Sequence, residues 1–352
     1  MCDGLKYICA LFFFVSCRDF EFIRTMPANK LLCNCMYLPI TGVLMENLRI
    51  VSLIASATEI VAALGMQKYL VGVSHECDYP PSVKNLPACS SSKIEMDERS
   101  YTIDEKVKAI VQESLSVYKV DADLLEALQP THIITQAQCE VCAVSMRDVE
   151  EAVCRITSSQ PQIVTLEPNC LADMWNDIHR VGDALGIPDE ASKLVDELKH
   201  RMKDITHRAQ QIDYAPTIAC IEWIDPLMST GNWMPELIEM AGGVNLFGEA
   251  GKHSPWMTWE DLVEKNPDVI LVMPCGFDIE RALEDMPVLT GKKEWTNLKA
   301  VHTNNVYVAD GNQYFNRPGP RLVDSLEILA EILYPDVFQF RYQGSGWIRL
   351  QV

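Results

Sequence analysis

The sequence of 352 residues lacks the excess of positive charge that nucleic-acid binding requires. It carries 30 lysines and arginines against 49 aspartates and glutamates, which gives a formal net charge of −19. A chain with this balance has no basic footprint for a phosphate backbone, so we expect no nucleic-acid partner. The acidic balance suits a cationic ligand, or a partner protein that presents a basic face.

The common local signatures of catalysis are also missing. The chain has no G-x-G-x-x-G dinucleotide loop, no phosphate-binding G-x-x-x-x-G-K-S/T loop and no G-x-S-x-G nucleophile turn. No nucleophile and base stand out by their spacing. These absences favour a protein that is not an enzyme.

Apolar runs long enough to cross a membrane are missing too, so we expect no membrane-spanning segment. The run YICALFFFV at residues 7–15 is much shorter than the ~20 residues that a spanning helix needs. It has the length of a signal-peptide core, but one Lys and one Asp precede it where a signal peptide carries positive charge. We therefore predict that residues 1–48 form a poorly structured extension, with a weak secretion signal as the alternative.

The thirteen cysteines show no regular disulfide framework. Five lie within the first 35 residues and eight are scattered through the body of the chain. A chain of this length can build a hydrophobic core without disulfide bonds. We therefore predict reduced thiols and favour a cytoplasmic location, with a periplasmic or secreted location as the alternative.

Short β-rich apolar runs alternate with segments of helical periodicity along the body of the chain. The strand-like runs are RIVSLIA, VGVS, HIIT, PQIVTL, TIACIEW, DVILVMP and VYVAD. Such alternation predicts an α/β fold with parallel sheets and right-handed crossovers. The second of two long helices, at about 188–211, is long enough to join two lobes. We therefore predict two Rossmann-like lobes at 49–170 and 213–336, a helical connector at 171–212 and a tail at 337–352 that looks loose, although Trp347 could dock.

Within the first predicted lobe, residues 82–100 are rich in serine and proline and read as a loop. Residues 103–120 have helical periodicity and are expected to form a helix.

Polar clusters follow several of the predicted strands, at the point where each strand ends. In open α/β sheets, ligands bind outside the carboxyl ends of the strands. Histidine is a frequent metal ligand, aromatic rings offer flat apolar walls, and arginine pairs with carboxylates. These residue types make His75, Glu76, Glu222, Trp223, Tyr314, Phe315 and Arg317 candidates for ligand contacts.

Cys139-x-x-Cys142 is the sharpest local motif. Two thiols at this spacing can hold one metal ion or form a redox pair. His75 and Cys77 follow another strand and could complete a four-ligand site. The alternative is that Cys142 packs in the core as a small hydrophobic residue.

The chain from about residue 49 to residue 335 resembles the substrate-binding proteins of cobalamin and iron-siderophore ABC importers, most closely the cobalamin-binding branch. The similar segments are VSLIASATEIVAALG, VGVSHECDYPP, LMSTGNWMPELIEMAGGVNLF, SPWMTWEDLVEKNPDVILV and YFNRPGPRLVDSLEILA. The resemblance implies two α/β lobes, a rigid helix between them, a ligand in the cleft and little hinge closure on binding. It also implies that the seven candidate residues, His75, Glu76, Glu222, Trp223, Tyr314, Phe315 and Arg317, face the cleft and bind the ligand.

The resemblance also implies a corrinoid or metal-chelate ligand and an ABC permease as partner. Asp123 and Glu236 are the candidates for the acidic residue that docks each lobe on the permease. The family's aromatic contacts in the first lobe are replaced by His75, Glu76 and Cys77, and a helix is inserted at 103–120. A haem-like tetrapyrrole, another chelate or a bare metal therefore stay open as ligands. A metal- or redox-active protein, or an enzyme, built on Cys139 and Cys142 is the alternative function.

Overall fold

The computed structural model describes residues 47–94, 98–112, 117–137, 145–155 and 159–351. Two β-sheets, each built around parallel strands, form its framework. The first sheet has four parallel strands in the order β2-β1-β5-β6, and the second has the order β12-β11-β10-β7-β8 with β9 beside β7. The strands of the first sheet are β1 Ile50–Ser52, β2 Leu70–Val73, β5 His132–Gln136 and β6 Gln162–Leu166. Those of the second are β7 Thr217–Trp223, β8 Met228–Ser229, β9 Val244–Asn245, β10 Val269–Val272, β11 Val306–Ala309 and β12 Trp347–Arg349.

Helices cover the sheets, as the alternating sequence pattern predicts. Those of the first lobe are α2 Ala55–Ala63, α3 Ser100–Gln112, α4 Ala122–Leu128 and α5 Met146–Arg155. The connector holds α6 Leu171–Ala184 and α7 Pro188–Ala209. Those of the second lobe are α8 Met234–Met240, α9 Trp259–Lys265, α10 Ile279–Asp285, α11 Pro287–Thr290, α12 Lys299–His302 and α13 Leu322–Leu333. Short 3-10 turns occur at η1 Gln67–Tyr69, η2 Pro81–Asn85 and η3 Trp295–Asn297.

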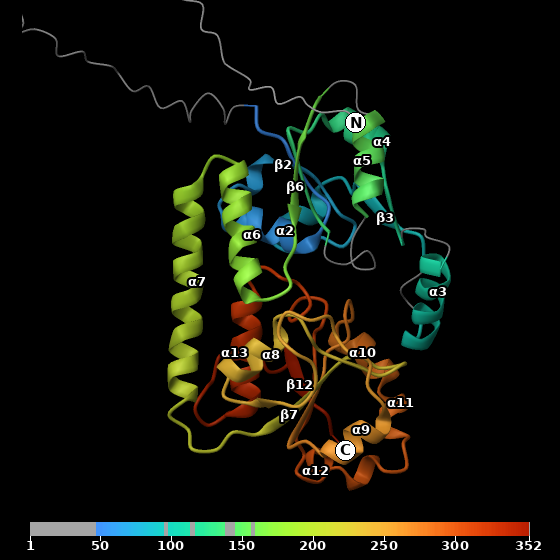
Figure 1. Ribbon diagram of the computed structural model, residues 1–352, viewed down its shortest axis with the longest axis vertical. Helices are drawn as coiled ribbons and strands as arrows, with labels where there is room; N and C mark the ends of the chain where they lie inside the picture. Colours follow the sequence, from blue (N-terminus) through green and yellow to red (C-terminus); the bar gives the residue numbers. More distant parts are fainter. Residues whose placement is uncertain (1–46, 95–97, 113–116, 138–144, 156–158, 352) are drawn as a thin grey trace, which may run out of the picture. The chain divides into compact units, whose positions relative to one another are not determined.

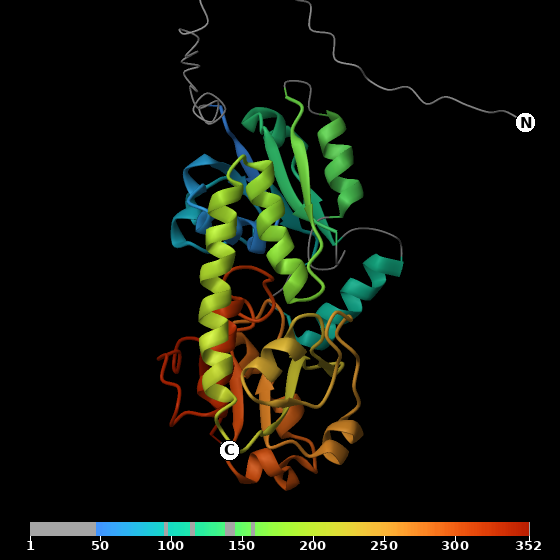
Figure 2. The ribbon, with the colours of Figure 1, turned by 60° about the vertical axis from the view of Figure 1, so that its left-hand side comes forward.

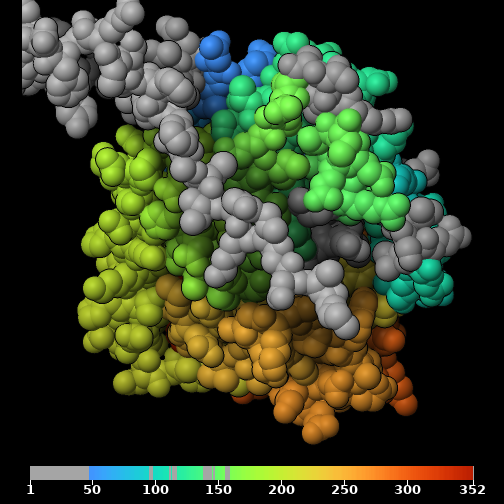
Figure 3. Space-filling model, turned by 45° about the horizontal axis from the view of Figure 1, so that its top comes forward, coloured from blue at the N-terminus to red at the C-terminus, as the bar shows by residue number. Residues whose placement is uncertain are grey.

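Helix α7 runs along both lobes (Figures 1 and 2). Pro188 occupies its first turn, where a proline has no hydrogen bond to lose, and Asp189 and Glu190 complement the positive end of the helix dipole. Its apolar stripe packs against α6 on one side and against α8 and α13 on the other. One hydrophobic core continues past α7 from the first sheet into the second. Figure 3 shows α7 along one flank of the molecule.

The region predicted as a loop followed by a helix at 103–120 folds differently. Helix α3 begins earlier and ends at Gln112, and Tyr118–Val120 form a strand, β4. This strand pairs antiparallel with β3, Ser90–Ser92, inside the segment predicted as loop. Alternate residues of β4 are buried and exposed, a period of two that is too short in three residues to stand out from the helical pattern before it.

The C-terminal tail, predicted to be loose, is docked on the second sheet. Strand β12 pairs antiparallel with β11, and Trp347 is buried. The Trp347 indole N–H donates to Glu331 Oε2 at 2.9 Å. Residues 279–302 form the short helices α10 to α12, with η3 between α11 and α12.

Six cysteines lie in the described ranges, and all six are free thiols. Within the same ranges, no helix combines the length and the apolar character needed to cross a bilayer.

Candidate functional site

His75 follows β2, at the carboxyl end of the first sheet, and its ring is held by serines. The ring Nδ1 lies 2.9 Å from Ser90 Oγ, and Ser90 Oγ in turn donates to Ser74 Oγ at 3.0 Å. Because the single hydroxyl proton of Ser90 is used on Ser74, the consistent arrangement has His75 Nδ1–H donating to Ser90. That tautomer leaves Nε2 with a free lone pair, which is the form that binds a metal ion.

Glu76 is the neighbour of this imidazole and is fixed from another strand. The Tyr118 hydroxyl donates to Glu76 Oε1 at 3.0 Å, and the Tyr118 ring packs 5.3 Å from the His75 ring. His75 Nε2 lies 4.0 Å from Glu76 Oε1, beyond hydrogen-bond distance. The sequence did not point to Tyr118, because the strand that carries it was expected to be the end of a helix.

Glu222 and Trp223 end β7, at the carboxyl end of the second sheet, and both are partly exposed. Ser254 donates to Glu222 Oε2 at 2.8 Å. The Trp223 indole N–H donates to the Asp225 carbonyl at 3.1 Å, and its ring packs 5.2 Å from the Phe277 ring. The structure therefore holds a carboxylate and an aromatic face at this strand end, as predicted, and adds Ser254 and Phe277 as their supports.

Tyr314 follows β11 and is half-buried between a cation and a second ring. The Arg321 guanidinium lies 5.4 Å from its ring centroid, and the Tyr342 ring packs edge-on at 5.8 Å. Burial raises the pKa of the Tyr314 phenol, so the group is neutral at ordinary pH. Tyr314 offers an apolar ring edge and a hydroxyl, and no negative charge.

Phe315 was predicted to wall the ligand, and the structure contradicts this. Its side chain is fully buried in the core that the two lobes share. Its amide donates to Ser325 Oγ at 3.0 Å, and the Trp233 indole N–H donates to its carbonyl at 2.7 Å. These bonds turn the side chain inward, so Phe315 supports the loop from below and cannot contact a ligand.

Arg317 was also predicted to bind ligand, but its guanidinium is occupied by the first lobe. It lies 2.5 Å from Asp78 Oδ1 and 3.3 Å from Glu59 Oε1, and it donates to Asn312 Oδ1 at 2.8 Å. Arg321 meets the same Glu59 carboxylate at 2.6 and 2.9 Å. We call Glu59, Asp78, Arg317 and Arg321 the interlobe ion network.

The network links the two lobes, and three of its four side chains are buried. Both arginines are 8% exposed and Glu59 is 3% exposed. Burial alone would raise the pKa of Asp78, but the hydrogen bonds and charge of Arg317 outweigh burial and hold that pKa below its usual value. Asp78 also accepts from the Asn312 amide at 3.1 Å. The loops after β2 and β11 therefore touch each other across the two lobes.

The predicted thiol–imidazole metal site finds no support in the described residues. Cys77 is buried beside Thr58 Oγ1 at 3.1 Å, and burial raises the pKa of its thiol to about 11. A neutral thiol in the core is a poor metal ligand. Cys139 and Cys142 lie outside the described residues. In the part of the chain that the structure describes, no group of three His, Cys, Asp or Glu side chains is placed to hold a metal ion.

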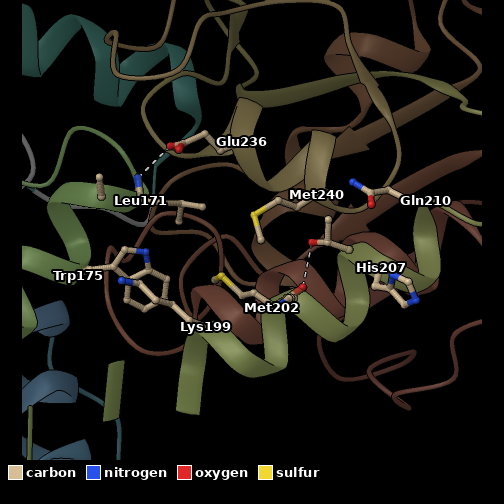
Figure 4. Close-up of a pocket in the computed structure, with 11 residues that line it drawn as sticks. Leu171, Trp175, Lys199, Met202, His207, Gln210, Glu236 and Met240 are labelled. Carbon is tan, nitrogen blue, oxygen red and sulfur yellow. Dashed lines mark hydrogen bonds between the residues drawn. The ribbon is translucent and has the colours of Figure 1, made fainter. Parts of the chain in front are cut away.

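The two candidate docking carboxylates differ in their surroundings. Asp123 is exposed in the first turn of α4. Glu236 is half-buried on α8, and its Oε2 accepts from the Leu171 amide at the start of α6, at 2.9 Å. Figure 4 shows this bond at the edge of a pocket of about 500 Å³ between α6, α7 and α8. Of the residues predicted for ligand or partner binding, only Glu236 lines that pocket.

The sequence of this chain matches a known protein family and is similar to several bacterial proteins. The profile of a family described as periplasmic binding protein matches residues 50–312. An ABC transporter substrate-binding lipoprotein of Bacillus subtilis, YvrC, is 27% identical over 299 residues, which cover 84% of this chain and 82% of that protein. A vitamin B12-binding protein of Vibrio cholerae is 23% identical, covering 81% of this chain and 88% of that protein.

Among solved structures, a periplasmic haem-binding protein from Pseudomonas aeruginosa has a similar fold. The TM-score is 0.64 at 19% sequence identity, and the match covers 86% of this chain and 98% of that one. The predicted fold class, two lobes with parallel sheets and a long helix between them, is confirmed by this similarity.

Proposed function

Because the chain belongs to the periplasmic binding protein family, we propose that it is the substrate-binding component of an ABC importer and captures a corrinoid between its two lobes. Similar proteins carry names that refer to ABC transport and to vitamin B12. The residues that we assign to the ligand are His75, Glu76, Glu222, Trp223 and Tyr314.

The observation that carries the proposal is the orientation of His75. Its Nδ1 is fixed on Ser90, so the opposite nitrogen is left as a lone-pair donor at the end of a strand. A histidine whose second nitrogen is held by a hydrogen bond is a well-oriented metal ligand. A metal-centred macrocycle placed at this strand end would receive Nε2 as an axial ligand.

The charges around the strand ends favour a corrinoid over a haem. Arg317 and Arg321 are both paired with carboxylates of the first lobe, whereas Glu76 and Glu222 are partly exposed carboxylates. The rim of a corrin ring carries amide groups, which donate hydrogen bonds to carboxylates. The rim of a haem carries two propionates, which carboxylates repel.

The proposal is tested by titrating the full chain with aquocobinamide and, separately, with haemin. We expect a shift of the corrin absorption bands that saturates at one equivalent, and weaker binding of haemin. His75→Ala should abolish the spectral shift of axial ligation. His200→Ala, at an exposed position on α7, is the matched control and should bind like the wild type.

Two results would contradict the proposal. Tighter binding of haemin than of cobinamide would overturn the charge argument and make a haem the ligand. Binding of neither, together with a metal ion that co-purifies with the protein and is lost on Cys139→Ser, would move the function to a thiol–metal centre.

A further inference from the structure

Helix α3 belongs to the first lobe by sequence but is docked on the second lobe. It lies between β3 and β4, which pair with each other. Yet Ile103, near its start, is 2% exposed and buried in the hydrophobic core of the second lobe. Val107, one turn later, packs against the cores of both lobes. Figures 1 and 2 show α3 on the side away from α7.

Polar contacts fix the start of the helix on α10. The Ser100 amide donates to Asp285 Oδ2 at 2.7 Å, so a carboxylate of the second lobe caps the N-terminus of α3. The Arg281 guanidinium donates to the Glu98 carbonyl in the segment just before the helix. Asp285 is 1% exposed and Arg281 lies 3.4 Å from it. A helix with one buried apolar anchor and a buried charged cap is bound to the second lobe and does not merely lie against it.

The contacts of α3 lead directly to the candidate ligand residues. The Arg281 guanidinium that holds its start lies 4.2 Å from the Phe277 ring, and Phe277 packs against Trp223. On the other side, Val107 packs on the core cluster that contains Tyr118, the residue that fixes Glu76. The helix is therefore attached behind both halves of the proposed site.

We propose that α3 is a further interlobe strut, and that Ile103 and Asp285 are positioning residues that preset the distance between the two halves of the ligand site. The part of this inference that concerns ligand affinity rests on the proposed function. The core along α7 and the interlobe ion network already join the lobes. A further connection through α3, on the side away from α7, restricts the rotation that these two connections leave. Binding to a preset site loses less conformational entropy, so the strut raises ligand affinity.

The test undocks α3 by substitution and measures the distance between the lobes with and without ligand. Ile103→Ser places a hydroxyl in the second-lobe core and should undock the helix. Ile332→Ser is the matched control, since Ile332 is a helical isoleucine, 3% exposed, in the other core cluster. Ile103→Val should restore wild-type behaviour. Spin labels on unnatural amino acids at Arg147 and Lys293, one exposed position on each lobe, report the interlobe distance.

We expect Ile103→Ser to lose hydrogen-exchange protection over α3 and to broaden the interlobe distance distribution. Its affinity for aquocobinamide should fall about tenfold. This is the loss expected if only about a tenth of the molecules keep the lobes at the distance that binds the ligand. Asp285→Asn, which keeps the side-chain size and weakens the cap, should give the same changes in smaller degree. The Ile332→Ser variant should show neither the exchange change in α3 nor the broadened distances.

Loss of α3 protection with an unchanged distance distribution would overturn the strut, whatever the ligand. A broadened distribution with unchanged cobinamide affinity would overturn the positioning role. If the wild type binds no cobinamide while the distribution still broadens in Ile103→Ser, the proposed function fails and the strut stands.

Discussion

Residues 75–76 in the loop after β2 and residues 315–317 in the loop after β11 are used in opposite ways, although the two loops look alike in sequence. Each is a polar and aromatic cluster at the carboxyl end of a parallel strand. After β2, His75 and Glu76 remain partly exposed and are fixed by Ser90 and Tyr118. After β11, Phe315 is buried in the core and Arg317 is paired with the other lobe.

A polar cluster at a strand end therefore identifies the edge of the sheet, but not whether its residues bind ligand or hold the lobes together. The edge is shared by ligand contacts and by contacts between lobes, because both sheets point their carboxyl ends toward the same region. An arginine at this edge lies close enough to carboxylates of the opposite lobe to pair with them. A charged side chain at this edge therefore stays available to a ligand only where the opposite loop places no opposite charge beside it.

The largest effect is expected from Glu59→Ala, which removes a carboxylate of α2 from the interlobe ion network. The change leaves Arg317 and Arg321 buried with one carboxylate fewer, and we expect a loss of about 3 to 5 kcal/mol in the free energy of unfolding. Urea denaturation measures it. Arg147→Ala is the control, because it removes an exposed pair with Glu151 and should cost below about 1 kcal/mol. Equal losses in the two variants would contradict a special role for the network.

A smaller loss in the free energy of unfolding is expected from Asp78→Asn, and the size of this loss should depend on pH. The pKa of Asp78 is lower in the folded protein than in the unfolded chain. Its stabilising contribution is therefore fully present above the ordinary Asp pKa of about 3.9 and is lost as the pH falls through the lowered folded value. At neutral pH we expect the variant to lose about 1 to 3 kcal/mol.

The measurement for Asp78 is the free energy of unfolding of wild type and variant from neutral pH down to about pH 3. The two curves should converge as the wild-type carboxylate is protonated. Curves that stay parallel over this range would show that the ion pair with Arg317 contributes nothing in solution.

His75→Ala tests the ligand side of the comparison, where the expected effect is on ligand binding and not on the fold. Loss of the axial donor should weaken cobinamide binding about tenfold, which corresponds to about 1.4 kcal/mol. Stability should change by about 0.5 kcal/mol at most, because the side chain is partly exposed. Calorimetric titration and thermal unfolding separate the two quantities. A variant that is strongly destabilised would show that the His75 side chain, too, serves the fold.

The smallest effect is expected from Tyr118→Phe, which keeps the ring beside His75 and removes the hydroxyl that binds Glu76. We expect a loss of about 1 kcal/mol or less in stability, and a change of about threefold in ligand affinity, since Glu76 stays in place but is less tightly oriented. Tyr101→Phe, at an exposed tyrosine of α3, is the control. If the two variants are indistinguishable in ligand binding, Glu76 does not contact the ligand.

Much of the fold and part of the site could be predicted from the chain alone. The strand-like runs, the long helix α7 and the two-lobe organisation are present as predicted, and the family match supports the expectation of a binding protein and not an enzyme. His75, Glu76, Glu222 and Trp223 lie at strand ends, because strand ends follow from local periodicity. The strand β4 and the docked β12 were missed, since a three-residue strand has too short a pattern to distinguish from its surroundings.

Local pattern by itself therefore determined the order of strands and helices, the connector and the edge where ligand chemistry is concentrated. Only the tertiary structure decided that Arg317 and Arg321 belong to an interlobe network, that Phe315 points inward and that α3 is docked on the second lobe. The physical reason is the distance along the chain. Arg321 and Glu59 are 262 residues apart, so no pattern within either segment records that the two side chains meet.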